Sequence, residues 1–201
     1  MFNHMRTFWC CIALLAVTGC DTSHTVVGNN ADEIRFYREH REHAQRYRDA
    51  VVNSMNQSTA LMVKMVSAPE SFSAGDAATL KVALENVRLA SETVEMFGKP
   101  MSEPLGTCGM LGSAALSAID ETIRSASEPE LTTAAEKKIK AYQITIGDCD
   151  RQLKSEPQAQ VFIQTRAGDA APKESCEPEL LKQVAEGKAL WRCREVSSTT
   201  S

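Results

Sequence analysis

The chain has few aromatic residues, no excess of positive charge and no second long apolar run. Aromatic residues make up 5% of its 201 residues, and 26 acidic residues outnumber 22 basic ones, so the net charge is −4. Nucleic-acid-binding proteins carry a clustered basic face, so we expect no nucleic-acid partner. Beyond the N-terminal segment, no apolar run reaches the roughly 20 residues that a membrane-spanning helix needs.

Several motifs that mark enzymes and metal sites are also missing. The sequence contains no CxxC, no GxSxG and no HExxH, which are typical of zinc or thioredoxin-like sites, serine hydrolases and zinc proteases. The glycine-rich stretch "GTCGMLG", residues 106–112, fits neither common phosphate-binding pattern. We therefore expect a protein that is not an enzyme, with no catalytic residues and no cofactor.

The N-terminal segment has the pattern of an export signal. Arg6 precedes about ten apolar residues, half the length of a membrane span, and small residues follow them. The end of this run, "VTGC" at Val17–Cys20, resembles the lipobox of bacterial lipoproteins, in which a cysteine follows an aliphatic residue and two small ones. The resemblance implies that residues 1–19 are a signal peptide and that Cys20 carries a covalent lipid.

The same resemblance implies a location. Two or three acyl chains anchor a protein durably in a membrane, so we expect a lipid-anchored protein of the bacterial cell envelope that faces the periplasm. In enterobacterial lipoproteins an aspartate directly after the lipidated cysteine resembles an inner-membrane retention signal. Asp21 occupies this position, which favours the inner membrane over the outer.

Four cysteines then remain for disulfides: Cys108, Cys149, Cys176 and Cys193. Disulfides persist in exported proteins, and four cysteines allow three connectivities. Cys108 and Cys149 are equally distant from "SEPE", a predicted turn between two helices, so an antiparallel hairpin would bring them together. Cys176 and Cys193 would lie about 25 Å apart on one helix, so we expect Gly187 to end a helix between them. We predict the pairs 108–149 and 176–193.

Apolar residues at helical spacing predict four amphipathic helices, over about residues 32–66, 76–98, 110–127 and 131–154. The stretch "QVFIQ", residues 160–164, could form one short strand or an extended segment. We expect an all-α fold, an antiparallel bundle of about four helices with a C-terminal disulfide-closed helical hairpin.

The predicted organisation follows from these elements. Residues 20–31 are a lipidated cysteine and flexible tether, 32–154 the bundle, 155–175 a linker, 176–196 the disulfide-closed segment and 197–201 a disordered tail.

The charged stretch "YREHREHAQRYRD", residues 37–49, holds the weak metal-ligand candidates His40 and His43. Oppositely charged residues four apart, such as Arg38 with Glu42 and Glu42 with Arg46, favour a solvated helix face. Contact with a partner or with lipid headgroups, or a metal site, are the alternatives. Three methionines, Met55, Met62 and Met65, lie on the apolar stripe and are expected in the core.

Trp191 and Arg192 are candidate interface anchors, because Trp and Arg dominate the energetics of protein interfaces; the alternative is that Trp191 covers the core. We expect a protein that binds or inhibits another protein, as immunity and inhibitor proteins do. One alternative is a structural or assembly lipoprotein of the envelope, working through its charged first helix. The other is a helical bundle that binds a small ligand or a metal.

Overall fold

The computed structural model describes residues 24–100, 102–180, 182 and 184–195. They form two compact units. The helical unit contains Gly28–Val161, and the sheet unit contains Phe162–Cys193 together with the described residues before Gly28. The predicted signal peptide, Cys20 and the predicted tail lie outside the described residues.

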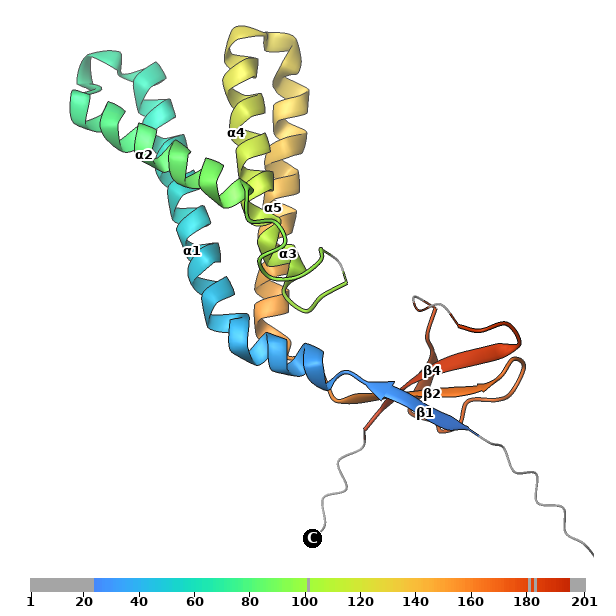
Figure 1. Cartoon of the computed structure of the whole chain (residues 1–201). Helices are drawn as coiled ribbons and strands as arrows, with labels where there is room; N and C mark the ends of the chain where they lie inside the picture. Colours follow the sequence, from blue (N-terminus) through green and yellow to red (C-terminus); the bar gives the residue numbers. More distant parts are fainter. Residues whose placement is uncertain (1–23, 101, 181, 183, 196–201) are drawn as a thin grey trace, which may run out of the picture. The chain divides into compact units, whose positions relative to one another are not determined.

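Two helical hairpins build the helical unit. The first pairs α1 (Ala31–Ser67) with α2 (Ala74–Ser91) through the 3₁₀ turn η1 (Pro69–Ser71), and the second pairs α4 (Leu111–Ser127) with α5 (Thr132–Lys154) through η2 (Pro129–Leu131). A short helix, α3 (Gly106–Gly109), precedes α4. Figure 1 shows the two hairpins meeting near the end of α2 and the start of α4. The predicted limits of the first, third and fourth helices are confirmed to within one or two residues.

The second helix ends seven residues earlier than predicted, at Ser91 rather than Gly98. The Ala90 carbonyl accepts hydrogen bonds from the hydroxyls of Tyr47 and Thr93, both at 2.8 Å. These side chains satisfy a carbonyl of the last turn, as helix ends require. The chain then turns back, and Gly98 adopts a φ of 91° within this loop.

The core of the helical unit lies where the two hairpins meet. Its largest fully buried side chains are those of Phe97, Leu105, Leu111 and Ile119, together with the cysteines of the Cys108–Cys149 disulfide. This disulfide joins α3 to α5 with the two Cα atoms 4.6 Å apart, so the predicted pairing is confirmed. The bridge closes the second hairpin at the end opposite to η2.

The glycines of "GTCGMLG" allow backbones to approach closely. A Cβ atom on Gly112 would overlap the backbone of Ala90, and one on Gly109 would overlap the carbonyl of Val94. The start of α4 therefore packs directly on the backbone of the last turn of α2, and the end of α3 packs on the backbone of the loop after α2. The glycine spacing serves packing between backbones.

Side chains of α1 hold the end of α5. The Leu153 carbonyl, in the last turn of α5, accepts hydrogen bonds from the Tyr37 hydroxyl and from Arg41 Nε, both at 2.8 Å. One turn earlier, Arg48 bonds both carboxylate oxygens of Asp150, at 2.9 and 3.0 Å. Cations at a helix C-terminus also complement the helix dipole. Arg41 and Arg48 of α1 therefore hold the end of α5, and the charged stretch is not only a solvated face.

The fold is not purely all-α, and the predicted C-terminal helical hairpin is wrong. Four strands form an antiparallel sheet in the order β1-β2-β4-β3. They are β1 (Thr25–Asn29), β2 (Gln160–Arg166), β3 (Cys176–Pro178) and β4 (Lys188–Arg194). The segment expected to be a tether thus contains β1, and the expected linker contains β2, which confirms the strand interpretation of "QVFIQ".

The sheet places the second disulfide between neighbouring strands. Cys176 lies directly opposite Cys193 in the antiparallel β3–β4 pair, and their Cα atoms are 4.0 Å apart. The predicted pairing is confirmed, but the break at Gly187, whose φ is 74°, leads into a strand. Opposed residues of a strand pair come close without any helix, so the spacing of the cysteines fits both geometries.

Replacing Gly112 with alanine is expected to lower the free energy of unfolding by roughly 1–3 kcal/mol or more, because the added methyl group overpacks a backbone contact. Gly147→Ala is the matched control, since a Cβ on this helical glycine meets no atom within 4 Å. It should raise stability by up to about 1 kcal/mol through helix propensity. Chemical denaturation with both disulfides intact measures both changes, and equal effects would contradict the close approach at Gly112.

Candidate functional site

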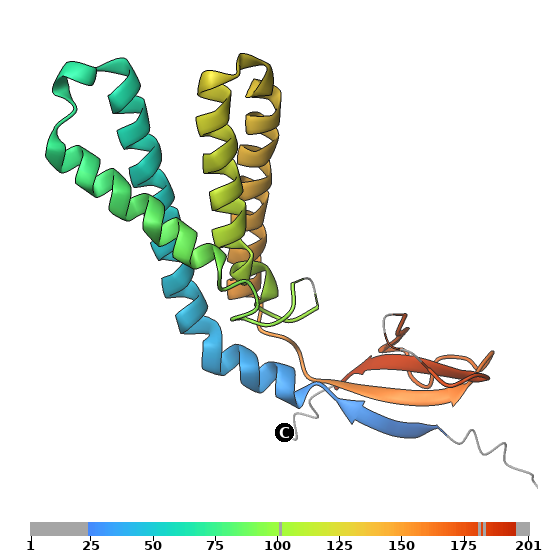
Figure 2. The ribbon, with the colours of Figure 1, turned by 45° about the horizontal axis from the view of Figure 1, so that its top comes forward.

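The apolar stripe of α1 becomes exposed toward the C-terminal end of the helix. Val51 and Met55 are buried, with 3% and 8% of their surface exposed, whereas Met65 is 43% and Val66 76% exposed. Figure 1 and Figure 2 show the reason, because the tips of the two hairpins stand apart in both views. The end of the α1–α2 hairpin therefore keeps apolar side chains that no helix of the second hairpin covers.

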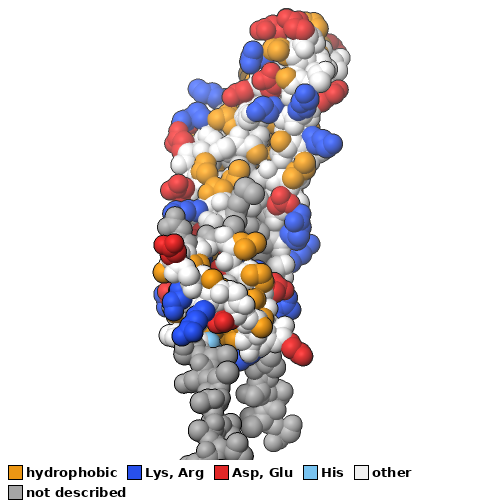
Figure 3. All heavy atoms as spheres, turned by 90° about the vertical axis from the view of Figure 1, so that its right-hand side faces the viewer, with side chains coloured by type: hydrophobic (Ala, Val, Ile, Leu, Met, Phe, Trp, Pro, Cys, Tyr) orange, Lys and Arg blue, Asp and Glu red, His pale blue; other side chains and the backbone are white. Residues whose placement is uncertain are grey.

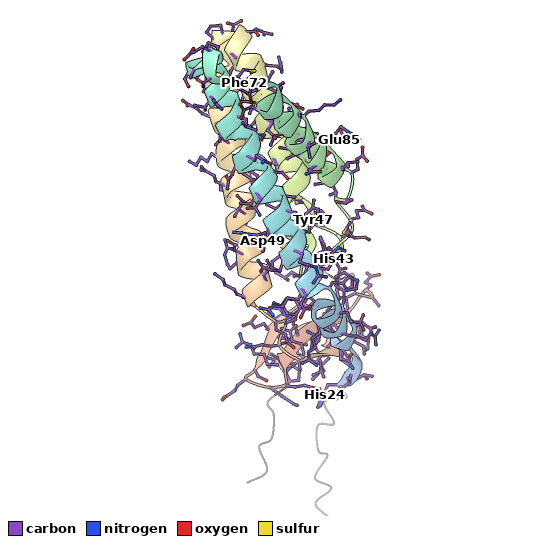
Figure 4. The ribbon with its side chains drawn as sticks, turned by 90° about the vertical axis from the view of Figure 1, so that its left-hand side faces the viewer. His24, His43, Tyr47, Asp49, Phe72 and Glu85 are labelled. Atoms are coloured by element: carbon purple, nitrogen blue, oxygen red, sulfur yellow. A yellow bond between two sulfur atoms is a disulfide. The ribbon has the colours of Figure 1, made fainter. Side chains whose placement is uncertain are left out.

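A hollow of about 460 Å³, the tip groove, lies between α1, η1 and α2. Its apolar walls come from Met65, Phe72, Ala77, Leu80 and Leu84, and Lys81 and Glu85 complete the lining. Figure 4 shows Phe72 at the tip and Glu85 farther along α2. Apolar walls with a few polar groups at the rim are typical of sites that receive apolar groups of a ligand or partner.

A network of polar contacts fixes the turn that carries Phe72. Ser73 and Asp76 form a capping box at the start of α2, with the Asp76 N–H donating to Ser73 Oγ at 3.1 Å and the Ser73 N–H donating to Asp76 Oδ2 at 2.8 Å. Lys64 Nζ, at the end of α1, lies 2.8 Å from the same oxygen. The Lys64 ammonium and the Ser73 donors lower the pKa of Asp76 to about 2. The network thus ties the end of α1 to the start of α2.

The lining of the tip groove is mostly apolar, with Lys81 and Glu85 as its charged residues. Its one carboxylate, Glu85, already pairs with Arg88 at 2.8 Å, and its remaining lining is hydrocarbon apart from Lys81. Within the part of the chain that the structure describes, no group of three or more His, Cys, Asp or Glu side chains could hold a metal ion. No described helix is long and apolar enough to span a membrane.

The predicted metal-ligand candidates pack against aromatic rings. The His40 ring stacks on Phe36 with the centroids 4.1 Å apart, and its Nδ1 lies 2.9 Å from the Phe36 carbonyl oxygen. His43 and Tyr47 lie one turn apart on α1 (Figure 4), and each ring contacts Phe97 edge-on at 5.3 Å. Among residues 24–100, 102–180, 182 and 184–195, no third metal ligand joins the two histidines.

The predicted interface anchors contact their own sheet unit. Trp191 Nε1 donates to Thr165 Oγ1 at 2.9 Å. Arg192 lies 3.7 Å from a carboxylate oxygen of Glu177 and 3.8 Å from one of Glu179. The two side chains are half-buried, and their polar groups are already engaged within the unit.

A second hollow, of about 540 Å³, lies at the opposite end of the helical unit from the tip groove. Its lining is polar and includes Glu33, Glu103, Asp148 and Arg151, of which the last two pair with each other. Charges of both signs are also interspersed over the face drawn in Figure 3. The second hollow and the face in Figure 3 thus have the mixed charges that are typical of protein surface in contact with water.

The tip groove was not predicted, because Met65 lies on the apolar stripe that we expect in the core of the bundle. A signal was present in the helix lengths. α1 has 37 residues, whereas α4 and α5 have 17 and 23. At a rise of 1.5 Å per residue, α1 is about 20 Å longer than α5, so its apolar stripe had to extend beyond its partners.

Comparisons with protein-family models, with curated protein sequences and with solved structures find no match. Of the two hollows described above, the tip groove has the more apolar lining.

We expect Lys64→Ala to raise the pKa of Asp76 from about 2 toward the ordinary aspartate value. Because the folded-state pKa lies below the unfolded value of about 3.9, the contribution of Asp76 to stability is present above about pH 4. It is lost as the pH falls through 2. NMR titration of the Asp76 carboxyl group measures the shift. Lys81→Ala removes a lysine that makes no ion pair with Asp76, so it should leave the titration midpoint of Asp76 unchanged. A larger shift of this midpoint in Lys81→Ala than in Lys64→Ala would contradict the network.

Proposed function

We propose that this chain is a non-enzymatic lipoprotein, anchored to the bacterial membrane and facing the periplasm, that binds or inhibits another protein. The observation that carries the proposal is the tip groove, an apolar hollow at the exposed end of a helical hairpin. Its occupant would be an apolar segment of the partner, and immunity or inhibitor proteins are the closest functional class.

The energetics of interfaces support this use of the groove. Contiguous exposed apolar surface is costly to leave in water and commonly marks an interaction site. Met65 and Phe72 supply the flexible and aromatic side chains that are enriched at interface centres.

The cysteine pattern supports the anchor. All four cysteines among the described residues form disulfides with one another, so neither of these bridges involves Cys20. Its place at the end of "VTGC" fits the lipobox of bacterial lipoproteins. The inner membrane is favoured by Asp21.

Other roles receive less support from the described residues. An assembly protein working through the charged start of α1 would use the exposed Arg35, Arg38 and Arg46. Arg41 and Arg48 instead bond α5. A metal carrier would need ligands beyond His40 and His43, whose rings pack on Phe36 and Phe97.

Cys20→Ala is expected to abolish incorporation of labelled palmitate and to move the chain out of the membrane fraction, because the acylated thiol is lost. Cys11→Ala, within the same segment, should leave both properties unchanged. Fractionation and metabolic labelling of the full chain in its bacterial host measure the effect. Undiminished labelling of the Cys20→Ala variant would contradict the anchor.

Met65→Asp is expected to weaken partner binding tenfold or more, because a charge would be buried in an apolar contact. The partner is first identified by a photo-crosslinking residue at position 65 of the full chain, and affinities are then measured with the isolated pair. Val63→Asp is the matched control, since Val63 is 60% exposed on the same helix and does not line the groove. Both variants should keep the parent melting temperature, and an equal loss of affinity in both would exclude the groove as the docking site.

A further inference from the structure

The sheet has two edge strands that differ in their protection. β3 has three residues, including Glu177 and Pro178, and a disulfide links it to β4. β1 has five residues, "TVVGN", all exposed, with Val26 at 62% and Val27 at 51%. It contains neither a charged residue nor a proline.

The unpaired backbone groups of an open sheet edge can bind further strands. Proteins normally prevent such pairing by placing charged residues or proline on the edge strand, or by keeping this strand short. β3 carries all three devices. In a two-fold strand pair centred on Glu177, like charges would face each other, which is destabilising, and Pro178 has no N–H to donate. β1 carries none of these devices, so its edge is the one suited to strand pairing.

The free backbone groups of β1 follow from its register. The Asn30 N–H donates to the Gln160 carbonyl at 3.3 Å, and residues alternate along a strand in the side to which their N–H and C=O groups point. Val26 and Gly28 therefore face β2, whereas Thr25, Val27 and Asn29 present their backbone groups to the outer edge. No other described strand pairs with this edge.

We infer that two copies of this chain pair through β1 in an antiparallel arrangement, with the two-fold axis at Val27. Val27 of one copy then faces Val27 of the other, and Thr25 faces Asn29. The pairing is self-complementary, as a two-fold interface requires, and it places no like charges opposite each other. It joins the sheets of both copies into one continuous sheet.

The second copy is the favoured occupant because of the distance between β1 and Cys20. Thr25 is five positions after Cys20, and five steps of about 3.4 Å each allow at most about 17 Å between them. The lipid anchor would thus hold β1 of every copy at a similar, short distance from the membrane. This raises the effective concentration of one edge near another. The concentration argument rests on the proposed anchor, but the pairing itself does not.

The test is disulfide formation between copies of the full chain in its native membrane, read on a non-reducing gel. Opposed residues that exchange backbone hydrogen bonds have Cα atoms about 5.5 Å apart, which a disulfide can bridge. Val27→Cys is expected to convert most of the chain into a covalent dimer. Thr25→Cys should stay monomeric, because its copies would lie about 14 Å apart at 3.4 Å per residue. The double variant Thr25→Cys with Asn29→Cys should dimerise.

A second variant tests the pairing without added cysteine. Val27→Pro removes an outward N–H and leaves the groups that face β2, so it should raise the dimer dissociation constant in detergent at least tenfold while the melting temperature changes little. Equal crosslinking at positions 25 and 27, membrane-bound chain that remains monomeric, or a crosslink to a different protein would each overturn the inference. Chain found outside the membrane fraction would instead count against the anchor.

Discussion

The buried Cys108–Cys149 disulfide is the constraint on which the helical unit depends. It closes the α4–α5 hairpin at the end where α5 finishes, and the Leu153 carbonyl, one turn farther on, accepts hydrogen bonds from Tyr37 and Arg41 of α1. The base of the unit is therefore held covalently and by charge-assisted bonds. At the tips each hairpin is closed by its own turn, η1 or η2, and the tip groove lies at the first of these turns.

The helices and disulfides could be predicted from the sequence because their signals are local. Proline and glycine mark the turns around η1 and η2, and the symmetric spacing of Cys108 and Cys149 about the second turn specifies their pairing. The end of α2 could not be predicted, since it depends on Tyr47, a residue more than 40 positions away that bonds the Ala90 carbonyl. The sheet was not predicted, because β1 and β3 are too short to show the alternating pattern of a strand in the sequence. They are recognisable as strands only through their pairing with β2 and β4.

The site residues chosen from the sequence were selected for their chemistry, and the structure gives each a local partner. His40 and His43 contact aromatic rings, Trp191 donates to Thr165, and Arg192 faces two glutamates. The tip groove has no such chemistry. It is made of methionine, leucine and phenylalanine side chains that resemble a core in sequence, and only the greater length of α1 distinguishes them from one.

The length of α1 bears on both proposals, because it separates the start of this helix from the tip groove. Met65 lies 34 residues beyond Ala31 on α1, which at 1.5 Å per residue is about 50 Å along the helix. The start of α1 is fixed by Asn30, whose side chain bonds the backbone of Gln158 and Gln160 at 2.9 and 2.8 Å. β1 ends directly before this point. Within the helical unit, the length of α1 therefore separates Met65 of the tip groove from this fixed start of the helix.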